Sequence, residues 1–233
     1  GKRPYGYASF RYELTPFLNY GTQKNVIAVK VDNSQQPNSR WYSGSGIYRN
    51  VWLVKTAQLH IDHWGIYVTT TEVSSTAATL AVQTLIKNVT GKKQSFILRQ
   101  TLYNAKGKPV SQTSGSFIAG NDTNVVIEQK LNVIAPRLWG IDEPYLYRLK
   151  TEVKQGNKIV DVQETKVGIR YFTFDAYNGF FLNGRSVKIN GVCNHHDLGC
   201  LGSAINKRAI ERQLEILKAM GVNAIRTSHN PPA

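Results

Sequence analysis

The chain has 233 residues, of which 41% are hydrophobic and 19% are charged. This length gives room for one large or two small domains, and the hydrophobic content is that of a globular protein, which excludes a disordered chain. The net charge of +14 could indicate a nucleic-acid binder, but the basic residues are scattered and cluster only in expected loops, GKKQ at 91–94 and KGK at 106–108. We therefore expect no nucleic-acid partner. We expect no membrane partner either, because no apolar run approaches the ~18 residues of a membrane-spanning helix.

The N-terminal stretch GKRPYGYASF is not a signal peptide, because it has neither an initiator Met nor an apolar segment. The chain is therefore expected either to start after processing or to begin inside a longer protein. Its two cysteines, Cys193 and Cys200, form no CxxC pair and define no disulfide framework, so they are predicted to be free thiols.

Residues 1–56 are expected to form strands and turns. Pro16 and Gly21 mark a turn region, and the apolar segment NVIAVKVD predicts a short buried strand. Farther along, RWYSGSGIYRNVWL places Gly44 and Gly46 between aromatic residues, where glycine allows a tight backbone path.

Residues 57–170 have a different sequence pattern: short apolar segments recur between clusters of Gly, Asn, Asp and Lys. Six or seven such segments, LHIDHWGIYVTT the first and IVDVQETKVGI the last, predict an antiparallel β-sandwich with Greek-key connections and no long helix. NAKGKPV and KQGNKIV have the composition of hairpin tips.

Residues 171–233 begin with a predicted hairpin turn at Asn183-Gly184, followed by a strand over 187–192. A helix is predicted from Asn206, a suitable N-cap, to Met220, and Gly221 can end it. The segment VNAIRTS then predicts a second strand. Strand, helix and strand within about 40 residues indicate a βαβ unit, whose two strands are parallel.

Polar side chains follow both strands of this unit. In parallel α/β arrays, functional groups gather at the carboxyl ends of the strands, which would bring His195, His196, Asp197, Arg226 and His229 to one rim. A zinc site is one interpretation, but the histidines lack the spacing of common zinc motifs, so no metal is expected. The other interpretation is that these polar residues only cap the strand ends.

Three blocks of the sequence, in order, resemble glycoside hydrolase family 2, the family of β-galactosidases, β-glucuronidases and β-mannosidases. RWYSGSGIYRNVWL resembles the block that ends its jelly roll, and LWGIDEPYLYRL with VGIRYFTF resembles the end of its immunoglobulin-like domain. FFLNGRSVKINGVCNHHD and GVNAIRTSHNP resemble the first two strands of its TIM barrel. The resemblance implies a mainly β chain: the end of a jelly-roll sugar-binding domain (1–56), an immunoglobulin-like β-sandwich (57–170) and the truncated start of a TIM-barrel catalytic domain (171–233).

The resemblance also implies roles for four residues. His195 and His229 match histidines that hydrogen-bond sugar hydroxyls, and Arg226 matches an arginine beside the catalytic nucleophile. Asp32 matches, with a gap, an acidic residue that the jelly roll contributes to the sugar pocket of β-galactosidases. In the block GVNAIRTSHNP, Asn230 stands at a position where the family often has Tyr.

The block FFLNGRSVKINGVCNHHD differs from the family spelling at its NHHD end, so no role passes to His196 or Asp197.

Catalysis in this family requires two glutamates, so the positions of the glutamates indicate whether this chain can be active by itself. None lies at the predicted rim, and in the family the acid and the nucleophile come from later barrel strands, so no catalytic residue is expected in this chain. The chain has eight glutamates: Glu13, Glu72, Glu128, Glu143, Glu152, Glu164, Glu211 and Glu215.

The resemblance therefore implies an inactive piece of a retaining β-glycosidase, β-galactosidase-like, that needs no cofactor and acts on terminal β-linked sugars of oligo- or polysaccharides. The parent is expected in the periplasm or outside the cell, with homo-oligomers possible. The alternative is a stand-alone carbohydrate-binding or adhesion module built on the sandwich.

Overall fold

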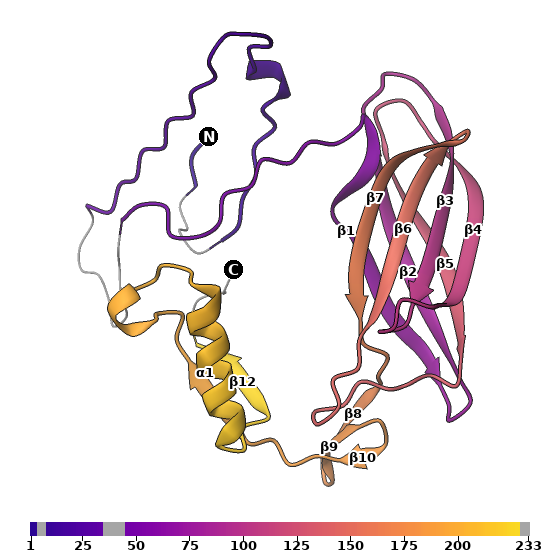
Figure 1. Ribbon diagram of the computed structural model, residues 1–233, viewed down its shortest axis with the longest axis vertical. Helices are drawn as coiled ribbons and strands as arrows, with labels where there is room; N and C mark the ends of the chain where they lie inside the picture. Colours follow the sequence, from indigo (N-terminus) through magenta and orange to yellow (C-terminus); the bar gives the residue numbers. More distant parts are fainter. Residues whose placement is uncertain (4–7, 35–44, 229–233) are drawn as a thin grey trace. The chain divides into compact units, whose positions relative to one another are not determined.

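The computed structural model describes residues 1–3, 8–34 and 45–228 (Figure 1). The chain divides into two compact units, residues 53–188 and the combination of 1–52 with 189–233. Each unit is described by itself. No helix in the described ranges is long and apolar enough to cross a membrane.

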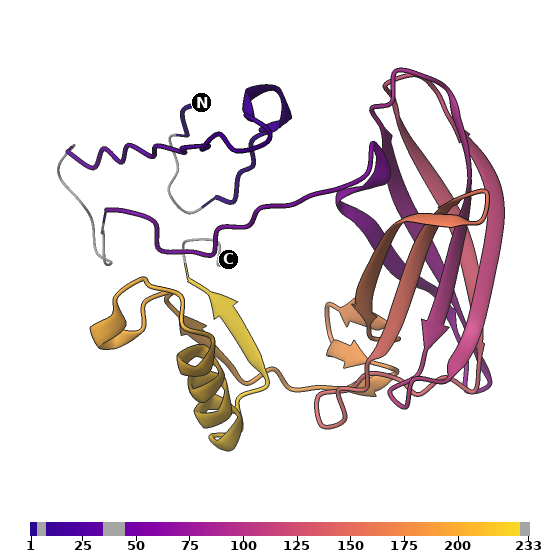
Figure 2. The same ribbon diagram turned by 45° about the horizontal axis from the view of Figure 1, so that its top comes forward.

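The 53–188 unit is the antiparallel sandwich that the sequence predicts. A three-stranded sheet in the order β1-β2-β5 faces a four-stranded sheet in the order β4-β3-β6-β7, and the neighbours that are not consecutive in sequence make Greek-key connections (Figures 1 and 2). The strands are β1 (Leu59–Val73), β2 (Ala77–Asn88), β3 (Gln94–Tyr103), β4 (Pro109–Ala119), β5 (Asn124–Ile134), β6 (Tyr147–Gln155) and β7 (Lys158–Val167).

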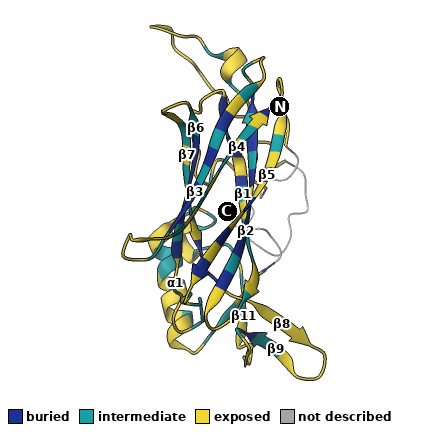
Figure 3. Cartoon of the chain, turned by 90° about the vertical axis from the view of Figure 1, so that its right-hand side faces the viewer, coloured by how far each residue is buried: buried dark blue, intermediate teal, exposed yellow. Residues whose placement is uncertain are grey.

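Alternating side chains of these strands fill the space between the sheets. In β5 the buried residues are every second one, Ile127, Gln129, Leu131 and Val133 (Figure 3), as a period of two requires when one face of a strand packs inward. The apolar residues form two clusters, one around Leu80, Leu102 and Leu149 and one around Ile86, Leu98 and Val153.

A polar layer separates the two apolar clusters. It consists of Thr84, Gln100, Gln129 and Thr151, one residue from each of β2, β3, β5 and β6. Along its strand, each of the four lies two residues from a member of one cluster and two residues from a member of the other. Three of the four are completely buried. The Gln100 side-chain amide donates a hydrogen bond to Thr84 Oγ1 at 2.9 Å, which ties the two sheets together within this layer.

A small sheet completes this unit: β8 (Phe172–Asp175), β9 (Gly179–Leu182) and β10 (Arg185–Ser186). The predicted turn joins β9 to β10, and Asn183 and Gly184 both have positive φ, 51° and 76°, as a type I′ turn requires. Asn183 Nδ2 donates to the Trp139 carbonyl at 2.9 Å. The hairpin therefore belongs to the unit of the sandwich. The predicted division at residues 56 and 170 stays a prediction.

The predicted strand NVIAVKVD is wrong for this structure. Residues 25–32 are not in a strand, and Val26, Ile27, Val29 and Val31 are all exposed. In residues 8–34 the one regular element is a 3₁₀ turn, Thr15–Phe17. A strand forms only where a neighbour pairs with its backbone, and the described part of residues 1–52 supplies no such neighbour. The jelly-roll assignment of 1–56 stays a prediction.

Residues 189–228 form the predicted βαβ unit. The strands β11 (Gly191–Asn194) and β12 (Ala224–Thr227) pair in parallel, and α1 (Lys207–Ala219) connects them. Asn206 caps the helix by accepting a hydrogen bond from the Ala209 amide at 3.0 Å. The first strand starts at Gly191 rather than at 187, because its partner strand begins at Ala224, opposite Gly191.

Candidate functional site

The carboxyl ends of β11 and β12 lie side by side, as the sequence predicts for a parallel pair. Asn194 is opposite Thr227, and the Ser228 amide donates to the Asn194 carbonyl at 2.9 Å, which continues the pairing one residue past the strand. The residues that follow β11 and β12 therefore leave the sheet at the same edge. This edge, residues 193–197 and 226–228, is called the rim below.

Two of the sequence-predicted site residues lie at the rim with exposed side chains, His195 directly after β11 and Arg226 within β12. His196 is half-buried, and its Nε2 is 3.1 Å from Ser203 Oγ in the segment before α1. This contact holds His196 against its own loop. His229 lies outside the described residues.

Arg226 has a partner that the sequence analysis missed. It stands opposite Cys193 in the parallel pair, and its Nη1 donates to Cys193 Sγ at 3.7 Å. The hydrogen bond from Arg226, followed by one with Ser228, holds the pKa of the Cys193 thiol below its usual value. Both cysteines are free thiols, as predicted. The sequence offered no signal for the Cys193–Arg226 contact, because it depends on the register of two strands that 29 residues separate.

Asp32 is exposed and makes its hydrogen bonds locally. Its Oδ1 accepts from the Ser34 hydroxyl at 2.6 Å and from the Ser34 amide at 3.2 Å. These two bonds lower the pKa of the Asp32 carboxyl, so the group is ionised at neutral pH. Within the described residues the carboxylate is thus oriented by its own turn, and its predicted place in a sugar pocket stays a prediction.

Neither glutamate of the βαβ unit belongs to the rim. Glu211 and Glu215 are on α1, where the Arg208 guanidinium binds both Glu215 oxygens at 2.9 and 3.0 Å. Glu152 is buried in the sandwich between Arg99 and Lys150. The residues of the rim therefore supply imidazole and guanidinium donors and include no glutamate. Among the described residues, no group of three or more His, Cys, Asp or Glu side chains is arranged to hold a metal ion.

Two family models match the chain. "Glycosyl hydrolases family 2" matches residues 59–170, which are the sandwich, and "Glycosyl hydrolases family 2, TIM barrel domain" matches residues 176–233, which contain the βαβ unit. Together they cover the chain from Leu59 onward except for residues 171–175.

Curated relatives and solved structures agree with this match. "Beta-galactosidase BoGH2A" of Bacteroides ovatus is 54% identical over the whole chain, which spans 27% of that protein, and "Beta-glucuronidase" of Bacteroides fragilis is 29% identical, with 35% of its length spanned. The chain thus covers about a quarter to a third of these relatives.

Among solved structures, a beta-glycosidase from Bacteroides vulgatus matches this chain with a TM-score of 0.86 and 34% identity. The match covers the whole of this chain and 29% of the beta-glycosidase chain. A glycosyl hydrolase family 2 member from Bacteroides cellulosilyticus matches with a TM-score of 0.84 and 40% identity. This match covers 87% of this chain and 28% of the other chain. Because both the sandwich and the βαβ unit match the same family, and a solved member of that family superposes on most of the chain, the protein belongs to glycosyl hydrolases family 2.

Proposed function

We propose that this chain is the non-catalytic front part of a retaining β-glycosidase, β-galactosidase-like, that removes terminal β-linked sugars from oligo- or polysaccharides. In this proposal the rim of β11 and β12 is one wall of the sugar pocket, and later barrel strands of the complete enzyme contribute the acid and the nucleophile. The observation that carries it is the rim itself, which presents His195 and Arg226 but no glutamate, in a chain that is 54% identical to part of a named beta-galactosidase.

The residue types suit this task. A neutral imidazole offers one donor and one acceptor, which match a sugar hydroxyl, and we assign this role to His195 and His229. A guanidinium beside a carboxylate keeps it ionised, as a nucleophile needs, and we assign this role to Arg226. The acid must meanwhile stay protonated, about 5–5.5 Å from the nucleophile in a retaining enzyme.

The chain alone is expected not to hydrolyse aryl β-glycosides, because each missing carboxylate contributes orders of magnitude to the rate. The test compares nitrophenyl β-galactoside and β-glucuronide turnover by this chain with turnover by a protein extended through the complete barrel. The extended protein should prefer the galactoside. Turnover by the 233-residue chain that disappears on mutation of one of its own glutamates would show that the active site has been misplaced.

In the extended protein, His195→Ala and Arg226→Ala should lower kcat/KM by different routes. The histidine should act through a hydrogen bond that strengthens in the transition state, and its loss should cost about 1–3 kcal/mol at every pH. The arginine should act through the charge of the nucleophile, so its loss should also move the acidic limb of the pH–rate profile to higher pH.

Thermal unfolding of the same samples separates this proposal from a purely structural role. If both variants keep kcat/KM within about twofold of the parent where they remain folded, and only the Tm falls, the two residues brace the rim and do not bind sugar. A change in kcat/KM at unchanged Tm supports the assigned roles.

The stand-alone binding module is the competing proposal. The match of residues 176–233 to a barrel domain speaks against it, because a binding module built on the sandwich would not need this segment. Binding of neutral glycans by the sandwich unit in the absence of any hydrolytic activity of the extended protein would favour the module. A periplasmic or extracellular location and homo-oligomer formation remain part of our proposal.

A further inference from the structure

A groove of about 500 Å³ opens at one end of the four-stranded sheet. The turn between β3 and β4, residues 104–107, forms one side, and the start of β6, residues 146–148, together with Lys166 of β7 forms the other. We call it the basic groove, because Lys106, Arg148 and Lys166 contribute its charged side chains and the groove contains no acidic residue.

Strand register places two of these cations next to each other. Arg148 of β6 stands directly opposite Lys166 of β7, and Tyr103 of β3 is opposite Arg148 on the other side. Opposite residues of an antiparallel pair point to the same face, and like charges in that position repel. The register therefore places two cationic side chains side by side on one face of the sheet.

The neighbouring carboxylates compensate only part of this charge. Glu164 forms an ion pair with Arg148, and both side chains are about half exposed. Across the described residues, no acidic side chain lies within 4.0 Å of the Lys106 or Lys166 amine. Two ammonium groups from different elements are thus available to a ligand.

The walls of the basic groove are held in place. Asn104 Oδ1 accepts hydrogen bonds from the Lys106 and Lys108 amides at 3.0 Å each, and the Ala105 amide donates to Tyr145 Oη at 3.1 Å. The Arg148 guanidinium lies over the Tyr103 ring, 4.6 Å from its centre. The turn backbone and the Arg148 side chain are therefore ordered before a ligand binds, which reduces the entropy lost on binding.

We propose that the basic groove binds an acidic oligosaccharide through carboxylate groups on its sugars, at a position outside the barrel domain. The basic groove is open to solvent and presents three cationic side chains, and ammonium and guanidinium groups form charge-assisted hydrogen bonds with carboxylates. The choice of a sugar as the ligand rests on the proposed function, whereas the preference for an anion rests on the groove alone. The groove would hold an acidic chain of the polysaccharide near the enzyme.

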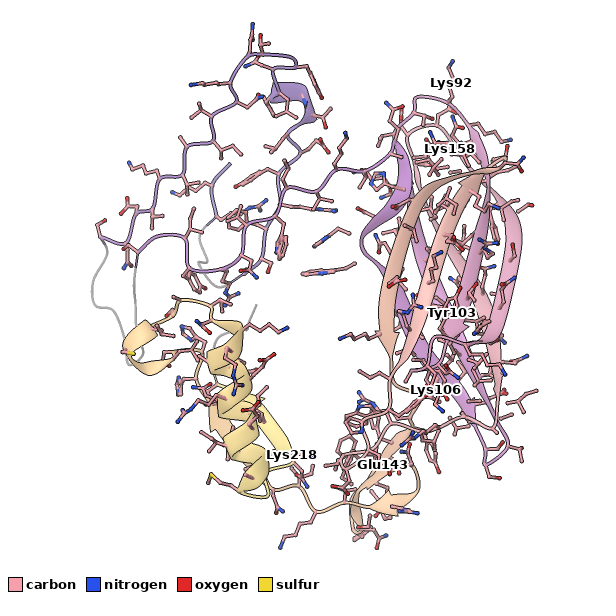
Figure 4. All side chains as sticks on the ribbon, in the orientation of Figure 1. Lys92, Tyr103, Lys106, Glu143, Lys158 and Lys218 are labelled. Atoms are coloured by element: carbon pink, nitrogen blue, oxygen red, sulfur yellow. The ribbon has the colours of Figure 1, made fainter. Side chains whose placement is uncertain are left out.

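The test measures binding of a galacturonic acid hexamer to the full 233-residue chain by calorimetry at low salt. Lys106→Gln with Lys166→Gln should weaken binding at least about tenfold, because two charge-assisted hydrogen bonds are lost. The matched control is Lys92→Gln with Lys158→Gln, which removes the same charge at the other end of the sandwich (Figure 4) and should leave binding within about twofold.

Three results would overturn the proposal: equal loss in the control variant, equal binding of a neutral galactose hexamer, or tighter binding of an oligonucleotide of the same charge. The last would show a general polyanion surface. Nitrophenyl β-galactoside turnover by the extended protein is measured in parallel, without substitutions and with the Lys106/Lys166 pair replaced. Normal turnover of the unmutated protein without hexamer binding by the unmutated chain refutes the groove and leaves the proposed function standing. Hexamer binding without turnover of the unmutated extended protein refutes the function alone.

Discussion

Two threonines of the polar layer have the same burial but different partners. Thr84 Oγ1 accepts a hydrogen bond from Gln100, whereas Thr151 Oγ1 has no partner among the described protein groups. Thr151→Val should therefore raise the free energy of unfolding by about 1 kcal/mol, because it removes a buried hydroxyl without a bond. Thr84→Val should lower it by about 1–3 kcal/mol, because it leaves the Gln100 amide unpaired. Urea unfolding of both variants checks this, and equal destabilisation would mean that Thr151 is bonded to buried water.

The ionisation of Glu152 makes the stability of the sandwich depend on pH. Burial alone would raise the pKa of this carboxyl, but hydrogen bonds from Lys150 and Arg99 outweigh burial and lower it. A carboxyl whose pKa is lower in the folded state stabilises the protein at pH values above its ordinary pKa of 4.5. This stabilisation is lost as the pH falls through the folded-state pKa. Glu152→Gln should thus cost about 2 kcal/mol at pH 7 and should flatten the loss of stability below about pH 4.5. Parallel pH curves for the two proteins would contradict the assignment.

At the scale of elements, the β9–β10 turn depends on one asparagine. Asn183 adopts positive φ and also bonds both the Trp139 carbonyl and the Tyr171 amide. Asn183→Gly loses the two bonds but fits the backbone, whereas Asn183→Ala loses the bonds and is strained as well. The alanine variant should be less stable than the glycine variant by about 1 kcal/mol. Equal Tm values for the two would show that the backbone conformation carries no cost here.

At the scale of the whole molecule, apolar burial is concentrated in one unit. Both apolar clusters draw their members from residues 59–169, and α1 contains no fully buried residue. Limited trypsin digestion should therefore cut residues 1–52 and 189–233 first, at exposed sites such as Lys24, Lys30 and Lys218. Mass spectrometry should find a persistent product close to residues 53–188. Cleavage within the sandwich at the same rate as at the ends would contradict this.

The elements that the sequence predicts correctly are those whose signals are local. The recurring apolar segments of the sandwich, the turn at Asn183-Gly184 and the Asn206 cap of α1 all depend on residues close together in the chain, and the structure confirms them. The predicted strand over 25–32 is absent, because an apolar run indicates only that a strand could form. Its formation requires hydrogen bonds from another segment.

The sequence by itself determined the family, the sandwich, the βαβ unit and the absence of glutamates from the rim, because these follow from motifs, periodicity and order along the chain. Only the tertiary structure decided which distant side chains meet: Arg226 with Cys193, Arg148 with Lys166, and the four residues of the polar layer. The physical reason is strand register. A shift of one residue turns every side chain of a strand to the other face, and the pairing that fixes this register is a property of the folded chain.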